Sequence, residues 1–284
     1  MLPNNRWLLC AALVFATGCS DPDSIVSSSS GIDAGLAPSQ GSSVGAFLDA
    51  SLDATRRHPD SSQSSRASDA DVGDAGEPRC GDLLARLRDF KDTHPDFEKF
   101  VGSGVKGIVL PALGADGKPV LDTSKPLREV TSPESFAQWY RDTPGVNLPI
   151  EITIPLQPVA DSFEYSNQAF FPLDGLGFGE QGRKRNYHFT TEIHTSFLYR
   201  GGEQFTFSGD DDLWIFVNGK LALDLGGTHS PQMGTVDFDA QAALLGITPG
   251  QSYKLDIFHA ERHTTASNFK IRTNIDCFRP VILI

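Results

Sequence analysis

Three consecutive carboxylates, Asp210, Asp211 and Asp212, stand directly before a run of five apolar residues. Neighbouring like charges repel one another, so an acidic triplet beside a buried strand costs free energy unless something offsets it. Calcium is the usual partner, because this hard cation prefers carboxylate oxygens. The apolar run ends at Asn218-Gly219, the dipeptide that most favours a two-residue hairpin turn. The pattern predicts a site at the mouth of a β-hairpin that a cation and a ligand can both reach.

Other polar residues close to the triplet in sequence are candidates for the same site. Trp214 lies within the apolar run, where it is either a core residue or a platform that stacks on a sugar ring. Asp224 and His229 flank a Gly-Gly pair, and the glycines there permit either a close backbone approach or a positive φ. The sequence leaves both alternatives open for each feature.

The run His259-Ala-Glu-Arg-His263 contains two histidines but lacks the HExxH order of zinc hydrolases. It lies where a predicted strand passes into a loop, and residues i and i+4 do not share a face there. The predicted β-domain, residues 80–284, contains no GxSxG motif, no cysteine with a nearby base and no phosphate-binding loop. A spaced pair of carboxylates for glycoside hydrolysis stays open, because the sequence does not show their separation in space.

Short alternating segments dominate the second half of the chain. They are separated by glycine, asparagine and proline, and no helices alternate with them, which indicates a β-sandwich or β-barrel and excludes a parallel βαβ sheet. The predicted strands are residues 151–156, 186–199, 204–208, 213–217, 221–225 and 235–238, followed by a hairpin of residues 253–260 against 268–276.

Two short helices are predicted before these strands. In residues 81–94 four apolar residues fall on one helical face, and Pro95 then ends the helix. In residues 131–140 a Thr-Ser-Pro-Glu segment fits an N-cap with proline in the first turn. The aromatic residues of this second helix form one face that pins it to the β-domain: Phe136, Trp139 and Tyr140.

The first 19 residues have the pattern of a lipoprotein signal peptide. A positive residue precedes an apolar stretch of about nine residues, too short to span a bilayer core that needs about twenty. Small residues then lead to Cys19, as in the lipobox of bacterial lipoproteins, so we predict lipidation at Cys19 and an outer-membrane lipoprotein exposed at the cell surface. An ordinary cleaved signal peptide, with an incidental cysteine, is the alternative.

Residues 20–79 are predicted to be a disordered linker, because Ser, Asp, Ala and Gly dominate and too few apolar residues are present to form a core. Residues 80–284 are long enough for one β-rich domain. The whole chain has 36 acidic and 24 basic residues and a net charge of −12, which argues against a nucleic-acid partner. Cys80 and Cys277 bracket the domain, and in an exported protein we expect them to form a disulfide rather than two free thiols.

Several long segments are similar to the fibro-slime domain, which belongs with the PA14 superfamily of β-barrels. They are RDFKDTHPDF (88–97), FAQWYRDTPGVN (136–147) and FFPLDGLGFG (170–179), continued by residues 186–229 and 255–269. The resemblance covers nearly the whole predicted domain. It implies a mostly β fold, a PA14-like β-barrel or sandwich with short helices.

In the fungal adhesins of that superfamily, two adjacent aspartates joined by a cis peptide bond bind a calcium ion that ligates sugar hydroxyls. The resemblance places this pair on Asp210 and Asp211, whereas many PA14 domains have glycine at the position of Asp212. The third carboxylate either adds a ligand or points to solvent. An acidic turn with solvated carboxylates and no metal is the alternative.

A second ligand loop follows the penultimate strand in those adhesins. The resemblance implies that this loop lies beside the acidic triplet, with Asn268 as the best oxygen donor for the metal; a satisfied polar loop is the alternative. The further residues that we predict to contact a ligand are Asp212, Trp214, Asp224, His229, His259, Arg262 and His263.

We predict a surface-anchored, non-catalytic binding module that recognises a carbohydrate or an extracellular matrix polymer in adhesion, with calcium as its cofactor. The alternatives are a glycan-active hydrolase and a structural matrix protein that binds other proteins without a metal. Membrane contact is expected through the lipid anchor alone, and self-association is open.

Overall fold

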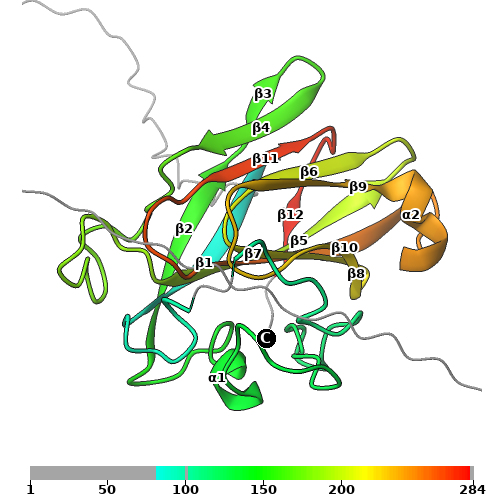
Figure 1. Cartoon of the computed structure of the whole chain (residues 1–284). Coiled ribbons are helices and arrows are strands. Elements are labelled where there is room, and N and C mark those ends of the chain that lie inside the picture. Colours follow the sequence, from blue (N-terminus) through cyan, green and yellow to red (C-terminus); the bar gives the residue numbers. More distant parts are fainter. Residues whose placement is uncertain (1–80, 100–101, 282–284) are drawn as a thin grey trace, which may run out of the picture. The chain divides into compact units, whose positions relative to one another are not determined.

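Alternating apolar residues build two antiparallel sheets, which the computed structural model describes for residues 81–99 and 102–281 (Figure 1). One sheet has seven strands in the order β2-β1-β5-β10-β7-β8, with β12 also paired to β5. The other has five strands in the order β3-β4-β11-β6-β9. The prediction of a mostly β domain with short helices is therefore confirmed.

The elements have the following bounds. The seven-stranded sheet consists of β1 (Asp82–Phe90), β2 (Asn147–Pro155), β5 (Phe189–Tyr199), β7 (Asp212–Val217), β8 (Lys220–Leu225), β10 (Gln251–Glu261) and β12 (Arg279–Pro280). The five-stranded sheet consists of β3 (Gln157–Val159), β4 (Ser162–Asn167), β6 (Gln204–Gly209), β9 (Gln232–Asp237) and β11 (Phe269–Thr273). The two helices are α1 (Pro133–Ala137) and α2 (Phe238–Leu245).

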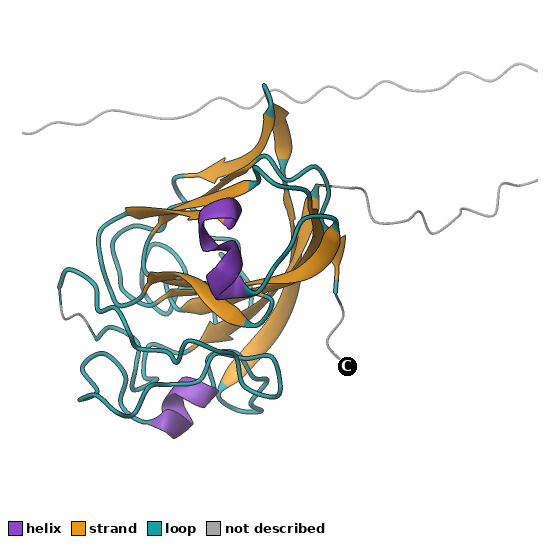
Figure 2. Ribbon diagram, turned by 90° about the vertical axis from the view of Figure 1, so that its right-hand side faces the viewer, coloured by secondary structure: helices purple, strands orange, loops and turns teal. Residues whose placement is uncertain are grey.

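The main hydrophobic core fills the space between the two sheets, which Figure 2 shows as two layers of strands. Leu87 and Ile257 enter it from the seven-stranded sheet, and Phe207 and Phe269 enter it from the five-stranded sheet. The rings of these two phenylalanines meet edge to face, with centroids 5.0 Å apart. Such packing ties the two layers together and fixes where their connections cross.

A second cluster covers the outer face of the seven-stranded sheet. Phe136, Trp139 and Tyr140 pack there against Trp214 of β7 and Phe258 of β10. Helix α1 starts with a capping box, in which the side chains and backbone N–H groups at its first turn bond reciprocally. The three aromatic residues pack against the sheet as predicted, but the helix ends at Ala137, so Trp139 and Tyr140 follow it and do not form a face of it.

The helix predicted in residues 81–94 is wrong, because residues 82–90 form strand β1. Leu83, Ala85 and Leu87 alternate into the main core, while Arg86 and Arg88 lie on the outer face in ion pairs. β1 pairs with β2 on one side and β5 on the other. Long-range hydrogen bonds on both edges therefore override the local helical spacing.

The predicted hairpin between residues 253–260 and 268–276 is also wrong. β10 pairs with β5 and β7, whereas β11 pairs with β4 and β6 in the other sheet. Besides β1, three strands and one helix were not predicted: β3, β4, β12 and α2. Helix α2 begins at the N-cap Asp237 and ends at Gly246, whose φ of 68° suits glycine.

The predictions for the N-terminal part fall outside the described residues. They concern the signal peptide, lipidation at Cys19, the linker 20–79 and the domain start at Cys80. The disulfide between Cys80 and Cys277 therefore stays a prediction. Within residues 81–99 and 102–281, no helix combines the length and the apolar character needed to cross a bilayer.

Candidate functional site

The acidic triplet lies where the chain crosses from one sheet to the other. β6 ends in the five-stranded sheet, and β7 begins at Asp212 in the seven-stranded sheet. Asp210 and Asp211 form the crossing, and the peptide bond between them is cis. The turn at Asn218 and Gly219, with φ of 52° and 74°, stands at the other end of β7. The triplet is thus at the open end of the β7–β8 hairpin, opposite its turn, as the sequence predicted.

A second crossing, residues 262–268 between β10 and β11, runs beside the first and holds Asp210. The backbone N–H of Asn268 donates to Asp210 Oδ1 at 2.5 Å, and Asn268 Nδ2 lies 3.1 Å from Asp210 Oδ2. The predicted neighbour of the aspartate pair is therefore in place, with its amide nitrogen toward the carboxylate. A half-turn of the side-chain amide presents Oδ1 instead, which is the atom that a cation ligand requires.

The carboxylate of Asp211 is held by backbone groups from two loops. Oδ1 accepts the N–H of His229 at 3.1 Å, and Oδ2 accepts the N–H of Arg262 at 3.2 Å. Asp210 is 5% exposed and Asp211 is 6% exposed, so both reach solvent over a small area only. Burial and the neighbouring charge of Asp212 raise the pKa of Asp211 to about 7.

Asp212 has neither of the roles that the sequence suggested. It is fully buried, so its carboxylate does not point to solvent. Oδ2 accepts from Arg262 Nε at 2.6 Å, and Oδ1 accepts the N–H of Gly227 at 2.6 Å. These bonds fasten β7 to the neighbouring loops and occupy both oxygens of the Asp212 carboxylate.

The prediction that Arg262 contacts a ligand is wrong, because its guanidinium is fully buried. Besides Asp212 it binds the Glu129 carboxylate at 3.0 Å and the backbone carbonyls of Asp96 and Glu129 at 2.9 and 3.2 Å. Its Cζ lies 4.7 Å from the centroid of the Trp139 ring. Burial opposes the charge, but the surrounding carboxylates keep the pKa of Arg262 above its ordinary value.

Trp214 is a core residue and not a sugar platform, because it is fully buried in the outer cluster. Its Nε1 donates to Asp224 Oδ1 at 3.0 Å, and Asp224 also accepts the N–H groups of Gly107 and Gly226. Asp224 therefore fastens a loop to the sheet rather than facing a ligand. For the Gly-Gly pair, the sequence left open whether glycine permits a positive φ or a close backbone approach. Both hold at Gly227: its φ is 86°, and a Cβ there would lie 2.4 Å from a backbone nitrogen.

Two of the three predicted histidines, His229 and His259, contact backbone carbonyl groups. His259 is fully buried, and its Nε2 donates to the Asp210 carbonyl at 2.8 Å; burial lowers the pKa of His259, so the ring is neutral. The ring nitrogens of His229 face the carbonyls of Ser230 and Leu225 and not the carboxylates. His263 is half-buried on the second crossing, 3.9 Å from a Glu98 carboxylate oxygen.

The sequence analysis missed Glu261, the last residue of β10. It is fully buried, and neither carboxylate oxygen has a hydrogen-bond partner; the hydroxyl of the buried Ser267 also lacks one. The Ser267 hydroxyl and the His263 N–H are close enough to act on its charge, but neither makes a hydrogen bond of normal geometry. Burial, followed by the charge of Asp211, raises the pKa of Glu261 well above its ordinary value.

The site holds more carboxyl groups than cationic groups. One guanidinium pairs with two of the buried carboxyl groups around the crossings, which are Asp210, Asp211, Asp212, Glu129 and Glu261. In the part of the chain that the structure describes, no three acidic, histidine or cysteine side chains converge to hold a metal ion. A cation at Asp210 and Asp211 would therefore need amide, carbonyl or water oxygens to complete its ligands.

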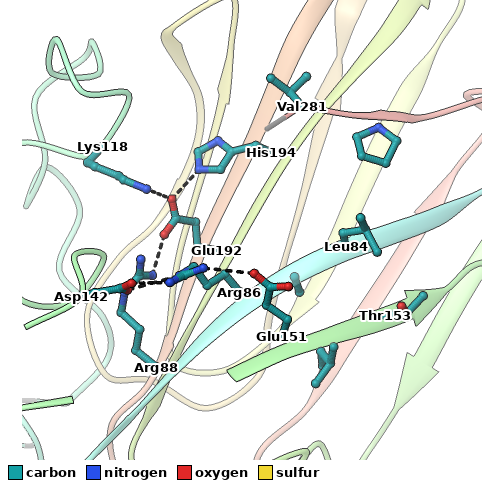
Figure 3. Close-up of a pocket in the computed structure, with 13 residues that line it drawn as sticks. Leu84, Arg86, Arg88, Lys118, Asp142, Glu151, Thr153, Glu192, His194 and Val281 are labelled. Carbon is teal, nitrogen blue, oxygen red and sulfur yellow. Dashed lines mark hydrogen bonds and ion pairs between the residues drawn. The ribbon is translucent and has the colours of Figure 1, made fainter. Parts of the chain in front are cut away.

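A separate cavity of ≈ 740 Å³ lies on the outer face of the seven-stranded sheet (Figure 3). Glu192 accepts there from Arg88 at 2.6 Å and also contacts Lys118 and His194. Burial opposes its ionisation, yet these partners lower the pKa of Glu192 to about 2. The pKa of Asp142 is lowered too, chiefly by its bond to an arginine. Neither carboxyl is suited to donate a proton at neutral pH, as glycoside hydrolysis requires.

The family model described as "PA14 domain" matches residues 178–279, which include both crossings. The chain is 41% identical over 218 residues to protein psiD of Dictyostelium discoideum, covering 71% of this chain and 42% of psiD. It is 39% identical over 212 residues to protein psiQ of the same organism, covering 69% of this chain and 20% of psiQ. The chain thus spans less than half the length of these curated relatives.

Solved structures with some likeness include a PA14 sugar-binding domain from an RTX adhesin, at 9% identity and a TM-score of 0.30. That match covers 71% of this chain and 95% of the other. Another is the epithelial adhesin 9 A domain of Candida glabrata in complex with Galb1-4GlcNAc, at 11% identity and a TM-score of 0.32. It covers 71% of this chain and 94% of the other.

Proposed function

We propose, from a PA14 domain whose two sheet crossings concentrate buried carboxylates, that this chain is a calcium-dependent carbohydrate-binding module for adhesion. The observation that carries the proposal is the excess of buried carboxylate charge at Asp210 and Asp211. A buried charge without a partner costs several kcal/mol. A hard divalent cation removes that cost by binding the same oxygens.

The residues present fit calcium. Asp210 and Asp211 supply two carboxylates from one crossing, and Asn268 supplies an amide from the other. The oxygens of Glu261 and Ser267 that lack hydrogen-bond partners show that the polar groups of this region are not satisfied by the protein alone. Bound calcium would supply a positive charge with open positions for the hydroxyl groups of a sugar.

The chain's own residues orient this site. The N–H groups of His229 and Arg262 each hold one oxygen of Asp211, so that carboxylate keeps a fixed direction. The ring Nε2 of His259 donates a hydrogen bond to the backbone carbonyl of Asp210 and so fixes the position of that residue. Because Arg262 neutralises Asp212, that carboxylate does not compete for the cation.

The accessible edge of the site suits a polar ligand. The loops that flank the two aspartates expose Ser230 and Pro231 on one side and Thr265 and Ala266 on the other. These four exposed side chains are small. Affinity per site should be modest, because sugar hydroxyls replace water molecules that bind the cation nearly as well.

Surface anchoring and the fibro-slime assignment are part of the same proposal. They rest on the lipobox-like residues before Cys19 and on the long similar segments in the domain. Replacing Cys19 by serine should abolish incorporation of a radiolabelled fatty acid and release the protein from the outer-membrane fraction. Labelling that persists in the Cys19→Ser protein would remove the anchor from the proposal.

A glycan array tests the binding function. The whole chain should bind a set of glycans in millimolar calcium and lose them in a chelator. Asp211→Asn should lose them in both conditions, while Asp161→Asn, an exposed carboxylate in the turn between β3 and β4, should bind like wild type. Turnover of any glycan would favour the hydrolase alternative. Binding of glycans that survives both the chelator and Asp211→Asn would contradict the proposed site.

A further inference from the structure

Glu261 occupies a position next to the proposed cation site that the sequence pattern did not assign. In the pairing of β10 with β7, Ala260 lies opposite Asp212, so the next residue, Glu261, lies alongside Asp211. The N–H of Arg262 donates to Asp211 and confirms that the two chain segments touch there. Glu261 is therefore anchored in a strand and held close to the aspartate pair.

The side chain of Glu261 points inward. Phe258 and Ala260 belong to the cluster on the outer face of the sheet. Successive residues of a strand face opposite sides, so Glu261 faces the space between the sheets, as His259 does. It has no exposed surface, and none of its described neighbours gives either oxygen a hydrogen bond.

Ser267 brings a third oxygen without a hydrogen-bond partner to the same region. It stands at the other end of the crossing that begins after Glu261, and it directly precedes Asn268, which holds Asp210. A single unsatisfied polar atom can be a local defect. Three such oxygens, all fully buried and on both ends of one loop, indicate a polar space that a water molecule or an ion fills.

We infer that Glu261 and Ser267 hold an ordered water that ligates the cation at Asp210 and Asp211, so that Glu261 sets the affinity of the site from outside its direct ligands. The inference rests on the proposed calcium function. A water bridge agrees with the finding that no three such side chains converge on one point among the described residues. Calcium sites often recruit a carboxylate through water in this way.

The charge of Glu261 gives this arrangement its effect. A carboxylate that accepts a hydrogen bond from a metal-bound water strengthens the water's bond to the metal and fixes its direction. Loss of such an outer partner usually weakens metal binding 10- to 100-fold. Glu261 is therefore a positioning residue that favours the loaded protein.

Calcium titration calorimetry on the whole chain, wild type and Glu261→Gln, tests the inference. We expect a dissociation constant about 10- to 100-fold higher in the variant. In a chelator, the thermal midpoint of Glu261→Gln should equal or exceed that of wild type, because the substitution removes no hydrogen bond of the Glu261 carboxyl group. A purely structural role would instead lower the midpoint and leave the affinity unchanged, which would overturn the inference.

Two further variants complete the experiment: one tests the same water independently, and one is a control. Ser267→Ala should also weaken calcium binding, and it tests the same water if Glu261→Gln does not fold. Glu203→Gln is the matched control, because Glu203 is a buried carboxylate whose oxygens accept the N–H groups of Arg200 and Gly201 in a remote turn. It should lower the thermal midpoint and leave the calcium affinity unchanged.

Europium luminescence lifetimes in H₂O and D₂O provide a readout of the water itself. Europium can replace calcium, and the two lifetimes count the water molecules bound to the metal. Glu261→Gln and Ser267→Ala should each change that number or its exchange behaviour relative to wild type, while Glu203→Gln should not. Wild-type affinity and water number in both variants would refute the inference alone. Absence of calcium binding by wild type, with no effect of Asp211→Asn, would instead refute the proposed function.

Discussion

Replacing Arg262 by methionine should destabilise the domain strongly. The guanidinium donates to two buried carboxylates, Asp212 and Glu129, and to two backbone carbonyls. Removing one partner of a buried ion pair costs about 3–5 kcal/mol, because the remaining charge is left without compensation. Since Arg262 serves two carboxylates, we expect a loss near the upper end, about 5 kcal/mol. A typical domain has only about 5–15 kcal/mol of stability in total.

The structure also predicts how this loss couples to Asp212. Asp212→Asn alone should cost about 1–2 kcal/mol, because the neutral amide can still accept from Arg262 and the Glu129 pair is kept. In the Arg262→Met background the same substitution removes a charge that no longer has a partner. It should then cost nothing or even stabilise, which gives a coupling energy of at least about 1–2 kcal/mol.

Urea denaturation of the four proteins, followed by tryptophan fluorescence, measures both quantities. Trp139 and Trp214 are buried beside the guanidinium and its partners, so their emission should report unfolding of this region. A free energy of unfolding for Arg262→Met within about 1 kcal/mol of wild type would refute the reasoning. Strict additivity of the two substitutions would show that Arg262 is not the charge that compensates Asp212.

Three more predictions concern the frame around the site. Gly227→Ala should destabilise by about 1–3 kcal/mol in a urea titration, because the φ of 86° and a backbone nitrogen 2.4 Å from the new methyl both oppose it; wild-type stability would contradict this. Burial opposes the charge of His194, but bonds to two carboxylates outweigh burial and raise its pKa. The stability that His194 contributes is therefore present below its ordinary pKa of about 6.5 and lost as the pH rises through the raised value, so His194→Gln should cost more at about pH 5.5 than at about pH 9. Equal costs at both pH values would show that the ring is not charged in the fold. Cys277→Ser should remove a disulfide detectable by non-reducing peptide mapping and lower stability by about 4–5 kcal/mol, whereas an unchanged peptide map would leave no disulfide to Cys80.

Local signals in the sequence predicted the local parts of the fold. The Asn218-Gly219 turn forms between β7 and β8, and Ser132 caps α1, because each depends on the conformational preferences of a few adjacent residues. Strand β7 lies where the apolar run predicted it, since all of its residues are buried. These features need no information about distant segments.

Features that depend on distant partners were not predictable in the same way. β1 has a spacing that fits a helix, and only its pairing with β2 and β5 makes it a strand. β10 and β11 are adjacent in sequence and belong to different sheets. Which strand pairs with which depends on the whole fold, so a short window of residues does not predict the pairing.

The same distinction explains the site. Asp210, Asp211 and Asn268 meet because they lie on two crossings between the same sheets, as the family resemblance implied. The sequence left Trp214 open between core and sugar platform and made Arg262 a ligand contact, but residues before β2 cover the outer face of the sheet and bury both. Glu261 carried a usable signal, since period-two alternation along β10 places it on the same face as His259.

The thermal midpoint of the whole chain, measured in millimolar calcium and in a chelator, tests the central claim most directly. At a free calcium concentration of about 100 times the dissociation constant, binding should stabilise the folded state by about 2.7 kcal/mol and raise the midpoint. Asp211→Asn should remove this shift, and Asp161→Asn should keep it. An identical midpoint in calcium and in chelator for the wild-type chain would contradict the account.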